Sequence, residues 1–348
     1  MILVLMLSFV FVVGACVGSF LNVAIARLPL EKSLLWPGSR CGACLQSIHW
    51  YDNLPLISYL WLRGRCRTCG QSFSALYLLI ELSTALGFVA LFWIELVVNV
   101  HDWPGHRTFA AQLGVLPWTS WLGFAWHAVL FSFLVVASVC DLQRREIPLQ
   151  LTLTGTLIGL VGALLMPWPF PQTVDIGPAP ANVIHEGIYA WPFWLPLPAF
   201  CGSGGNWQTG LLTGVLGALI GTFLLRSIGF IFGKGLGKEA LGLGDADLMM
   251  MVGAFLGWQI VVVAFFLSPL FALIFGIIQL AVNKDNSLPF GPFLSLSVMM
   301  TCLSWNYLGA KVQPFFFWFE LMFWGCILCA GVLYLMSFML RLLRQAPG

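Results

Sequence analysis

Residues 2–26 read ILVLMLSFVFVVGACVGSFLNVAIA and contain no charged side chain. A helix needs about 20 apolar residues to cross the hydrocarbon core of a bilayer, so this stretch alone predicts a transmembrane helix. The nearest basic residue, Arg27, follows the stretch, whereas a cleaved signal peptide carries its basic residues in front. Residues 2–26 are therefore expected to be a retained membrane span.

The whole chain has the composition of a membrane protein. Of its 348 residues, 59% are hydrophobic and 9% are charged, whereas a soluble domain has about 25% charged residues. The 29 Phe and 16 Trp exclude a disordered chain, which is poor in aromatic residues. The net charge of +2 provides no basic surface for nucleic acid, so the expected surroundings are membrane lipid and no nucleic acid partner is expected.

Further apolar stretches predict an all-α, polytopic integral membrane helical bundle of about eight spans. The short stretch 246–257 begins at an acidic pair, Asp245 and Asp247, and predicts a short or re-entrant helix. The other predicted spans lie at 76–98, 118–140, 148–168, 208–232, 258–282, 289–306 and 314–340.

The distribution of basic residues predicts the orientation, because cytoplasmic loops carry an excess of Lys and Arg. The loop after the first span holds six basic residues, which places this loop in the cytoplasm and the N-terminus outside. If 246–257 dips into the membrane and 258–282 returns, all 16 Lys and Arg except Arg107 and Lys311 lie inside. We therefore expect this topology.

These boundaries give five segments. Residues 1–26 are the first span, 27–74 a cytoplasmic loop domain, and 75–117 the second span with an outer loop. Residues 118–306 form the membrane core with an outer insertion at 169–207, and 307–348 add a C-terminal span.

The cytoplasmic loop contains two Cys-x-x-Cys pairs, separated by 21 residues: Cys41, Cys44, Cys66 and Cys69. This spacing is close to that of two-knuckle zinc sites, and four thiolates complete the tetrahedral shell of Zn²⁺. Two disulfides or four unrelated thiols are the alternatives, but disulfides are disfavoured in a reducing cytoplasm. We predict a structural zinc ion, since no ligand position remains for a substrate.

Two aspartates are expected at the inner face of the membrane. Asp141 ends the third span, and Asp245 stands in Gly242-Leu-Gly-Asp245, where the next short helix begins. Two carboxyl groups that share a site cannot both ionise cheaply, so one stays protonated. Such a pair can activate water and protonate a leaving amine. The competing interpretation is that each Asp only caps its helix.

Two smaller features have structural interpretations. Glu81 lies near the inner start of the second span, where pairing with an inner Arg is the expectation. His101 and His106 flank a Pro-Gly turn in an outer loop, and we expect no metal site there.

In this setting the chain resembles the bacterial type IV prepilin leader peptidase/N-methyltransferases, which are membrane aspartic peptidases of the GxGD type. The matching motifs occur in order through most of the chain. They are GSFLNV (18–23), RLP (27–29), WYDNLP (50–55) between the cysteine pairs, RGRC (63–66), Glu81-Leu82, Asp141 with Ile147-Pro148, GLGD (242–245) with Leu248, and PFGPFL (289–294).

The resemblance implies removal of the leader peptide of type IV prepilins or type II secretion pseudopilins at the cytoplasmic face of the bacterial inner membrane. It implies that Asp141 and Asp245 are catalytic, that the cysteine loop binds zinc, and that S-adenosylmethionine donates a methyl group to the new N-terminus. The methyl-transfer site is not apparent from the sequence, in which Glu81 and the cysteine loop are the only candidates. Asp247 stands where the family commonly has Lys, which places a like charge near Asp245. The alternative from another functional class is a polytopic transporter or assembly factor with a zinc-ribbon docking loop.

Overall fold

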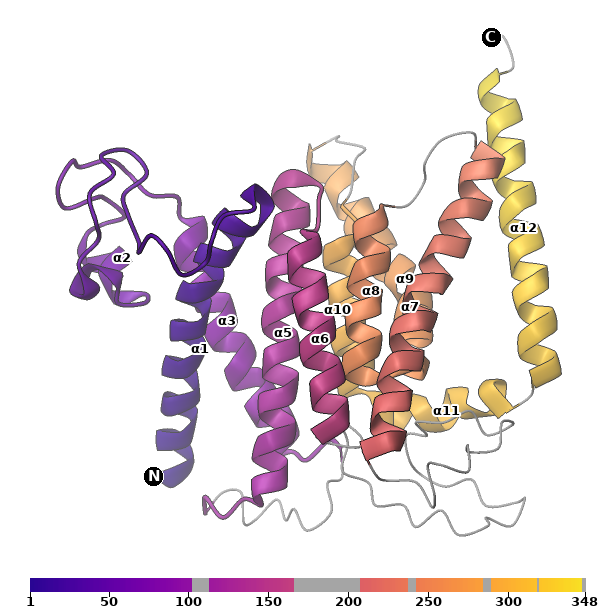
Figure 1. Cartoon of the computed structure of the whole chain (residues 1–348), viewed down its shortest axis with the longest axis horizontal. Coiled ribbons are helices and arrows are strands. Elements are labelled where there is room, and N and C mark those ends of the chain that lie inside the picture. Colours follow the sequence, from indigo (N-terminus) through magenta and orange to yellow (C-terminus); the bar gives the residue numbers. More distant parts are fainter. Residues whose placement is uncertain (102–112, 166–206, 237–241, 284–288, 318, 346–348) are drawn as a thin grey trace. The chain divides into compact units, whose positions relative to one another are not determined.

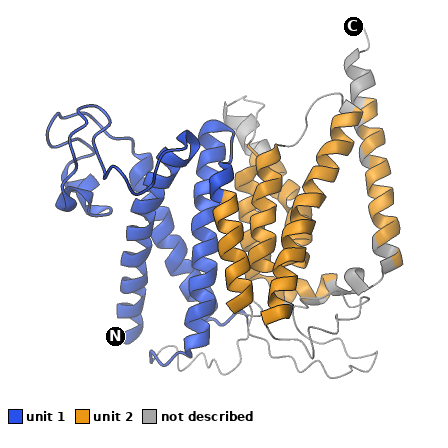
Figure 2. Ribbon diagram, viewed as in Figure 1, with its two compact units in different colours: residues 1–151 blue, residues 152–348 orange. Residues whose placement is uncertain are grey.

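The computed structural model describes residues 1–101, 113–165, 207–236, 242–283, 289–317 and 319–345. Within these ranges the regular structure is helical apart from two isolated β-bridges, so the all-α prediction is confirmed. The chain divides into two compact units, Met1–Leu151 and Thr152–Gly348 (Figure 2).

Unit 1 consists of helices that run alternately between its two ends (Figure 1). Its long helices α1 and α5 run toward the end that carries the cysteine loop, and α3 runs away from it. Its elements are α1 (Ile2–Arg27), η1 (Leu28–Leu30), η2 (Trp50–Asn53), α2 (Ile57–Trp61), α3 (Leu76–Phe92), the π-helix η3 (Trp93–Val97) and α5 (Trp118–Arg144).

Small residues bring α1 and α3 together. A Cβ atom at Gly14 would lie 2.8 Å from Ala85 Cα, and one at Gly18 would lie 2.7 Å from Glu81 Cα. Glycines four residues apart let two helix backbones approach closely, which is a common packing mode in membranes. The crossing therefore fixes Glu81 against the C-terminal half of α1.

The other helices that the described residues form lie in unit 2: α6 (Leu149–Leu165), whose first turn belongs to unit 1, α7 (Trp207–Leu236), α8 (Leu243–Leu256), α9 (Trp258–Asn283), α10 (Gly291–Leu303), α11 (Trp305–Phe317) and α12 (Phe319–Gln345). The short α8 starts at the end of the unit where α7 stops, and α9 returns to that end (Figure 1). Gly257 makes the reversal with a φ of 80°, a left-handed conformation that glycine adopts without strain. The chain therefore reverses its direction between α8 and α9, as predicted for residues 246–282.

The α7–α8 contact is the tightest in unit 2. A Cβ at Gly217 would lie 2.1 Å from the Gly253 carbonyl oxygen, and one at Gly221 would lie 2.2 Å from the Met249 carbonyl oxygen. The two backbones thus touch directly, and any side chain at these positions would push α8 away. Since Asp245 lies in the first turn of α8, this contact determines where its carboxyl group stands.

The lengths of the apolar helices agree with a polytopic protein. Five described helices are long and apolar enough to span a membrane: Ile2–Leu30, Leu76–Val97, Trp118–Arg144, Gly210–Gly235 and Trp258–Phe275. Three shorter apolar helices are Leu149–Leu165, Gly291–Leu303 and Phe323–Met336. Together they coincide with the eight predicted stretches. The separate helix α11 was not predicted, because its polar residues interrupt the apolar pattern. The predicted insertion at 169–207 lies outside the described residues except for Trp207.

Candidate active site and metal centre

The four loop cysteines form one cluster. All four Sγ atoms lie within 4.8 Å of one another, and Cys41 Sγ and Cys69 Sγ are 3.8 Å apart. A Zn–S bond of about 2.3 Å gives a tetrahedral S···S edge of about 3.8 Å. All four are free thiols. The cluster therefore has the donor set and the spacing that a tetrahedral zinc ion requires.

Each cysteine pair is shaped by the same eight-residue turn. Residues 40–47 read RCGACLQS and residues 65–72 read RCRTCGQS, and an antiparallel β-bridge joins the first and last residue of each segment. In both turns the first Cys accepts a backbone hydrogen bond, from Leu45 in one and from Gly70 in the other. These two residues have φ values of 57° and 70°, a region in which leucine is strained and glycine is not.

The backbone of these turns promotes thiolate formation. Amides of Cys44 and Ala43 point at the Cys41 thiol and lower its pKa to about 6, and corresponding amides of Cys69 and Thr68 lower the pKa of Cys66. The amide of Gln71 has the same effect on Cys69, but burial and the neighbouring thiols outweigh it and raise that pKa to about 11. A metal cation would stabilise all four thiolates, since the thiolate is the form that binds metal.

An ion pair anchors the segment between the two turns. Arg67 donates two hydrogen bonds from Nε to the Asp52 carboxylate oxygens, at 3.0 and 2.9 Å, and a third from Nη2 at 2.6 Å. The Arg67 guanidinium holds the pKa of Asp52 below its usual range and also lies over the Tyr51 ring. The pair therefore fixes η2 to the second cysteine turn.

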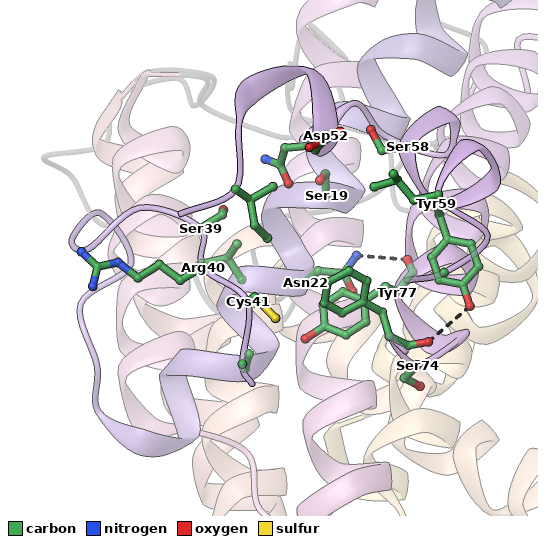
Figure 3. A pocket seen from close by; sticks show the side chains of 18 of the residues that line it. Ser19, Asn22, Ser39, Arg40, Cys41, Asp52, Ser58, Tyr59, Ser74 and Tyr77 are labelled. Atoms are coloured by element: carbon green, nitrogen blue, oxygen red, sulfur yellow. Dashed lines mark hydrogen bonds between the residues drawn. The ribbon is translucent and has the colours of Figure 1, made fainter. Parts of the chain in front are cut away.

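A cavity of about 580 Å³ lies between the cysteine loop, the C-terminal end of α1 and the N-terminal end of α3 (Figure 3). Its wall combines helix residues with residues of the first cysteine turn, among them Asn22, Tyr77, Glu81, Arg40 and Cys41. Asn22 donates a hydrogen bond to the Tyr77 carbonyl oxygen at 3.0 Å, which links the two helices at the floor. This volume is within the range of small-molecule binding sites.

Glu81 supports the loop that closes this cavity. Its Oε2 accepts a hydrogen bond of 2.7 Å from the Leu56 amide, and Leu56 has a φ of 61°. The predicted pairing of Glu81 with an inner Arg is therefore wrong: the carboxylate binds a backbone amide. Polar side chains of Ser19 and Asn22 lie beside it. A carboxylate at this point can hold a strained loop residue in place.

Asp141 lies three residues before the end of α5, at the same end of unit 1 as the cysteine loop. Asp245 lies in the first turn of α8 in unit 2. Both residues are buried, with 8% and 9% of their surface exposed. The convergence of these two residues, one from each unit, stays a prediction.

Asp247 has a cationic partner that sequence reasoning missed. Nη2 of Arg226, on α7, donates a hydrogen bond to Asp247 Oδ1 at 3.2 Å. The expected like charge beside Asp245 is therefore partly neutralised within unit 2. The two residues are 21 positions apart on different helices, so no local pattern indicated the pair.

Two regions of the chain match known protein families. A profile described as the Bacterial Peptidase A24 N-terminal domain matches residues 12–94, and one described as the Type IV leader peptidase family matches residues 182–277. Relatives called Prepilin leader peptidase/N-methyltransferase include one from Myxococcus xanthus, 34% identical over 78% of this chain and 62% of the relative. Those from Pectobacterium carotovorum and Aeromonas salmonicida are each 31% identical, over 82% and 83% of this chain and 88% of each relative.

The chain belongs to the type IV prepilin leader peptidase family. The predicted family is confirmed, and with it the class of enzyme. The chain is an aspartic peptidase and a multi-pass inner membrane protein. A transporter or assembly factor is not favoured. No solved structure matches the chain. The profile matches include the four cysteines and Asp245, whereas Asp141 lies between them.

This leader peptidase also contains a cluster that the sequence did not predict. It is formed by Glu95, His101 and His127. All three are buried in unit 1, and their candidate ligand atoms lie within 4.8 Å of one another. The only signal for this cluster in the sequence was the presence of Glu95 in an apolar stretch, because a carboxylate within the membrane is costly without a partner.

Proposed function

We propose that this chain removes the leader peptide of type IV prepilins or type II secretion pseudopilins, with Asp141 and Asp245 as the catalytic pair. The observation that supports this role best is that each aspartate is buried at a helix end, and that Asp245 follows two glycines, Gly242 and Gly244. Glycines at that position leave room for an extended peptide backbone.

The two helix ends suggest different roles in the first step. Asp245 lies in the first turn of α8, where the helix dipole favours negative charge, and Asp141 lies near the end of α5, where the dipole disfavours it. We therefore assign the general base to Asp245 and the general acid to Asp141. Asp245 takes a proton from a water molecule as the water oxygen attacks the scissile carbonyl carbon. Asp141 gives a proton to the leaving nitrogen as the C–N bond breaks.

The site would face the cytoplasm, and the N-terminus of the chain would lie outside. Asp141 lies at the end of unit 1 that carries the cysteine loop, and the basic residues of that loop favour the cytoplasmic side. A prepilin whose hydrophobic segment lies in the membrane would present its leader there.

A structural Zn²⁺ would hold the cysteine loop, bound by Cys41, Cys44, Cys66 and Cys69. The free energy of metal binding would stabilise a segment that has little hydrophobic core of its own. The loop in turn forms one wall of the 580 Å³ cavity.

We propose this cavity as the site for S-adenosylmethionine, which supplies an electrophilic methyl group to the new N-terminal amine. The Tyr77 ring offers a surface on which an adenine can stack, and the Glu81 carboxylate and Arg40 provide opposite charges on its wall. We expect Tyr77→Ala to weaken S-adenosylmethionine binding about tenfold, the loss of one aromatic contact. Tyr334→Ala, on α12, is the matched control; equal binding by both variants would contradict this assignment.

Leader removal tests the aspartate pair. In membranes co-expressing a prepilin, Asp141→Asn and Asp245→Asn are each expected to abolish cleavage while the protein still inserts and binds zinc. Asp247→Asn is the matched control, since it removes a carboxylate of the same helix that the proposed chemistry does not use. Cleavage at the normal rate in either single variant would refute the pair.

A further inference from the structure

Three ionisable side chains meet in the interior of unit 1, at the end remote from the cysteine loop. Glu95 Oε1 is 2.7 Å from His127 Nδ1 and 3.5 Å from His101 Nε2. The side chains of Glu95 and His127 have no exposed surface, and that of His101 has 1%. Such a group is costly to bury at membrane depth, so its presence needs a physical reason.

The local fold brings these residues together by two departures from regular helix. Glu95 lies in the π-helix η3, where the extra residue per turn changes the direction of the side chains that follow α3. Asn99 then adopts a φ of 56°, and the chain turns back so that His101 lies against the end of η3. His127 comes from the middle of α5, which packs on η3.

The Glu95 carboxylate is incompletely satisfied by its two imidazole neighbours. Oε1 faces both rings, whereas Oε2 is fully buried and has no hydrogen-bond partner. A buried polar oxygen without a partner costs about 1–3 kcal/mol. A hydrogen-bonded triad alone leaves this oxygen unexplained, but a bound cation would use it.

The donor set matches a transition-metal site. Two imidazoles and one carboxylate bind zinc in sites that have three protein ligands and one water. Metal–ligand bonds of about 2.1 Å give tetrahedral edges of about 3.4 Å, close to the 3.5 Å between His101 and Glu95. The 2.7 Å contact of His127 must open by about 0.7 Å, or Oε2 must replace Oε1 as the ligand.

We propose that Glu95, His101 and His127 bind a divalent transition-metal ion, Zn²⁺ by the nature of its ligands, separate from the cysteine site. Two neutral imidazoles and a carboxylate suit zinc better than the oxygen-seeking cations Mg²⁺ and Ca²⁺. Because the cluster is buried, the ion would join the end of α3 to α5 as a structural element. This proposal is independent of the proposed function, since none of the three residues belongs to the peptidase or methyl-transfer site.

Metal content of the purified full-length chain tests the proposal. Purified with added zinc and without chelators, the wild type is expected to hold two zinc ions per chain, and Glu95→Gln and His127→Gln are each expected to hold one. His49→Gln, an exposed histidine of the cysteine loop, should keep two. One zinc ion in the wild type, or two in both cluster variants, would overturn the proposal.

Zinc X-ray absorption on the wild type avoids the risk that a variant fails to fold. The expected first shell contains sulfur at about 2.3 Å from the cysteine site. It also contains nitrogen or oxygen at about 2.0–2.1 Å from the second site. A shell of sulfur alone at full zinc loading would also overturn the proposal.

Discussion

The contact between α7 and α8 predicts that adding one methyl group at Gly221 disables the peptidase. A Cβ there would lie 2.2 Å from the Met249 carbonyl oxygen and 2.7 Å from the Met249 carbonyl carbon. Both are backbone atoms, so no side-chain rotation relieves the collision. Met249 is one helical turn beyond Asp245, the proposed general base.

The displacement follows from these distances. Ordinary van der Waals contact begins at 3.4 Å, so α8 must move by at least 3.4 − 2.2 = 1.2 Å. Misplacing a catalytic group by about 1 Å can cost about 10²-fold in rate. Overpacking costs about 1–3 kcal/mol of stability, and replacing a helical glycine with alanine returns about 1 kcal/mol. We therefore expect Gly221→Ala to remain folded and to lose leader cleavage by about 10²-fold.

The rate of leader removal from a purified prepilin in proteoliposomes measures this loss. Gly325→Ala and Gly331→Ala on α12 are matched controls, because nothing lies within 4 Å of a Cβ at either position. They receive the same gain in helix propensity without a collision. Cleavage by Gly221→Ala within twofold of these controls, with zinc content unchanged, would refute the packing explanation.

Three further predictions concern the loop and the helix end that carries Asp245. Leu45→Gly should strengthen zinc retention against a competing chelator, because Leu45 has a φ of 57° and a leucine in the left-handed region costs about 1–2 kcal/mol. Gly70→Leu should weaken zinc retention for the same reason. Equal retention by the two variants would contradict this explanation. Arg67 lowers the pKa of Asp52, so the pair stabilises the loop above the ordinary Asp pKa and loses this effect as the pH falls through the lowered value. Asp52→Asn should therefore increase proteolysis of the loop at neutral pH, and its difference from the wild type should vanish in acid. Arg226→Gln should shift the acid limb of the cleavage pH profile upward by about half a unit, because the charge of Asp247 then acts without compensation on Asp245, the proposed general base in the same helix.

Local patterns predicted much of this molecule because their physical causes are local. A span requires a run of apolar residues, and a zinc turn requires two cysteines at fixed spacing, so both can be recognised in a short segment. The reversal between α8 and α9 was predicted from the number of basic residues expected on either side of the membrane.

The partners of individual polar groups were not predictable in this way. Glu81 was expected to pair with an arginine, yet it accepts a hydrogen bond from the Leu56 amide, whose left-handed backbone no sequence rule indicated. Asp247 was expected to leave a like charge uncompensated, yet Arg226 comes from the preceding helix. Each of these contacts depends on how two helices or loops pack, and packing is a property of the whole unit.

The cluster of Glu95, His101 and His127 shows the physical reason most clearly. The two histidines are six and 32 positions from the glutamate, which is not a ligand spacing within any one helix, and a π-helix is required to turn Glu95 toward them. A buried carboxylate in an apolar helix was the one available signal, and it indicates only that some partner exists. Buried charges in membrane helices therefore predict sites, whereas the fold determines which residues complete them.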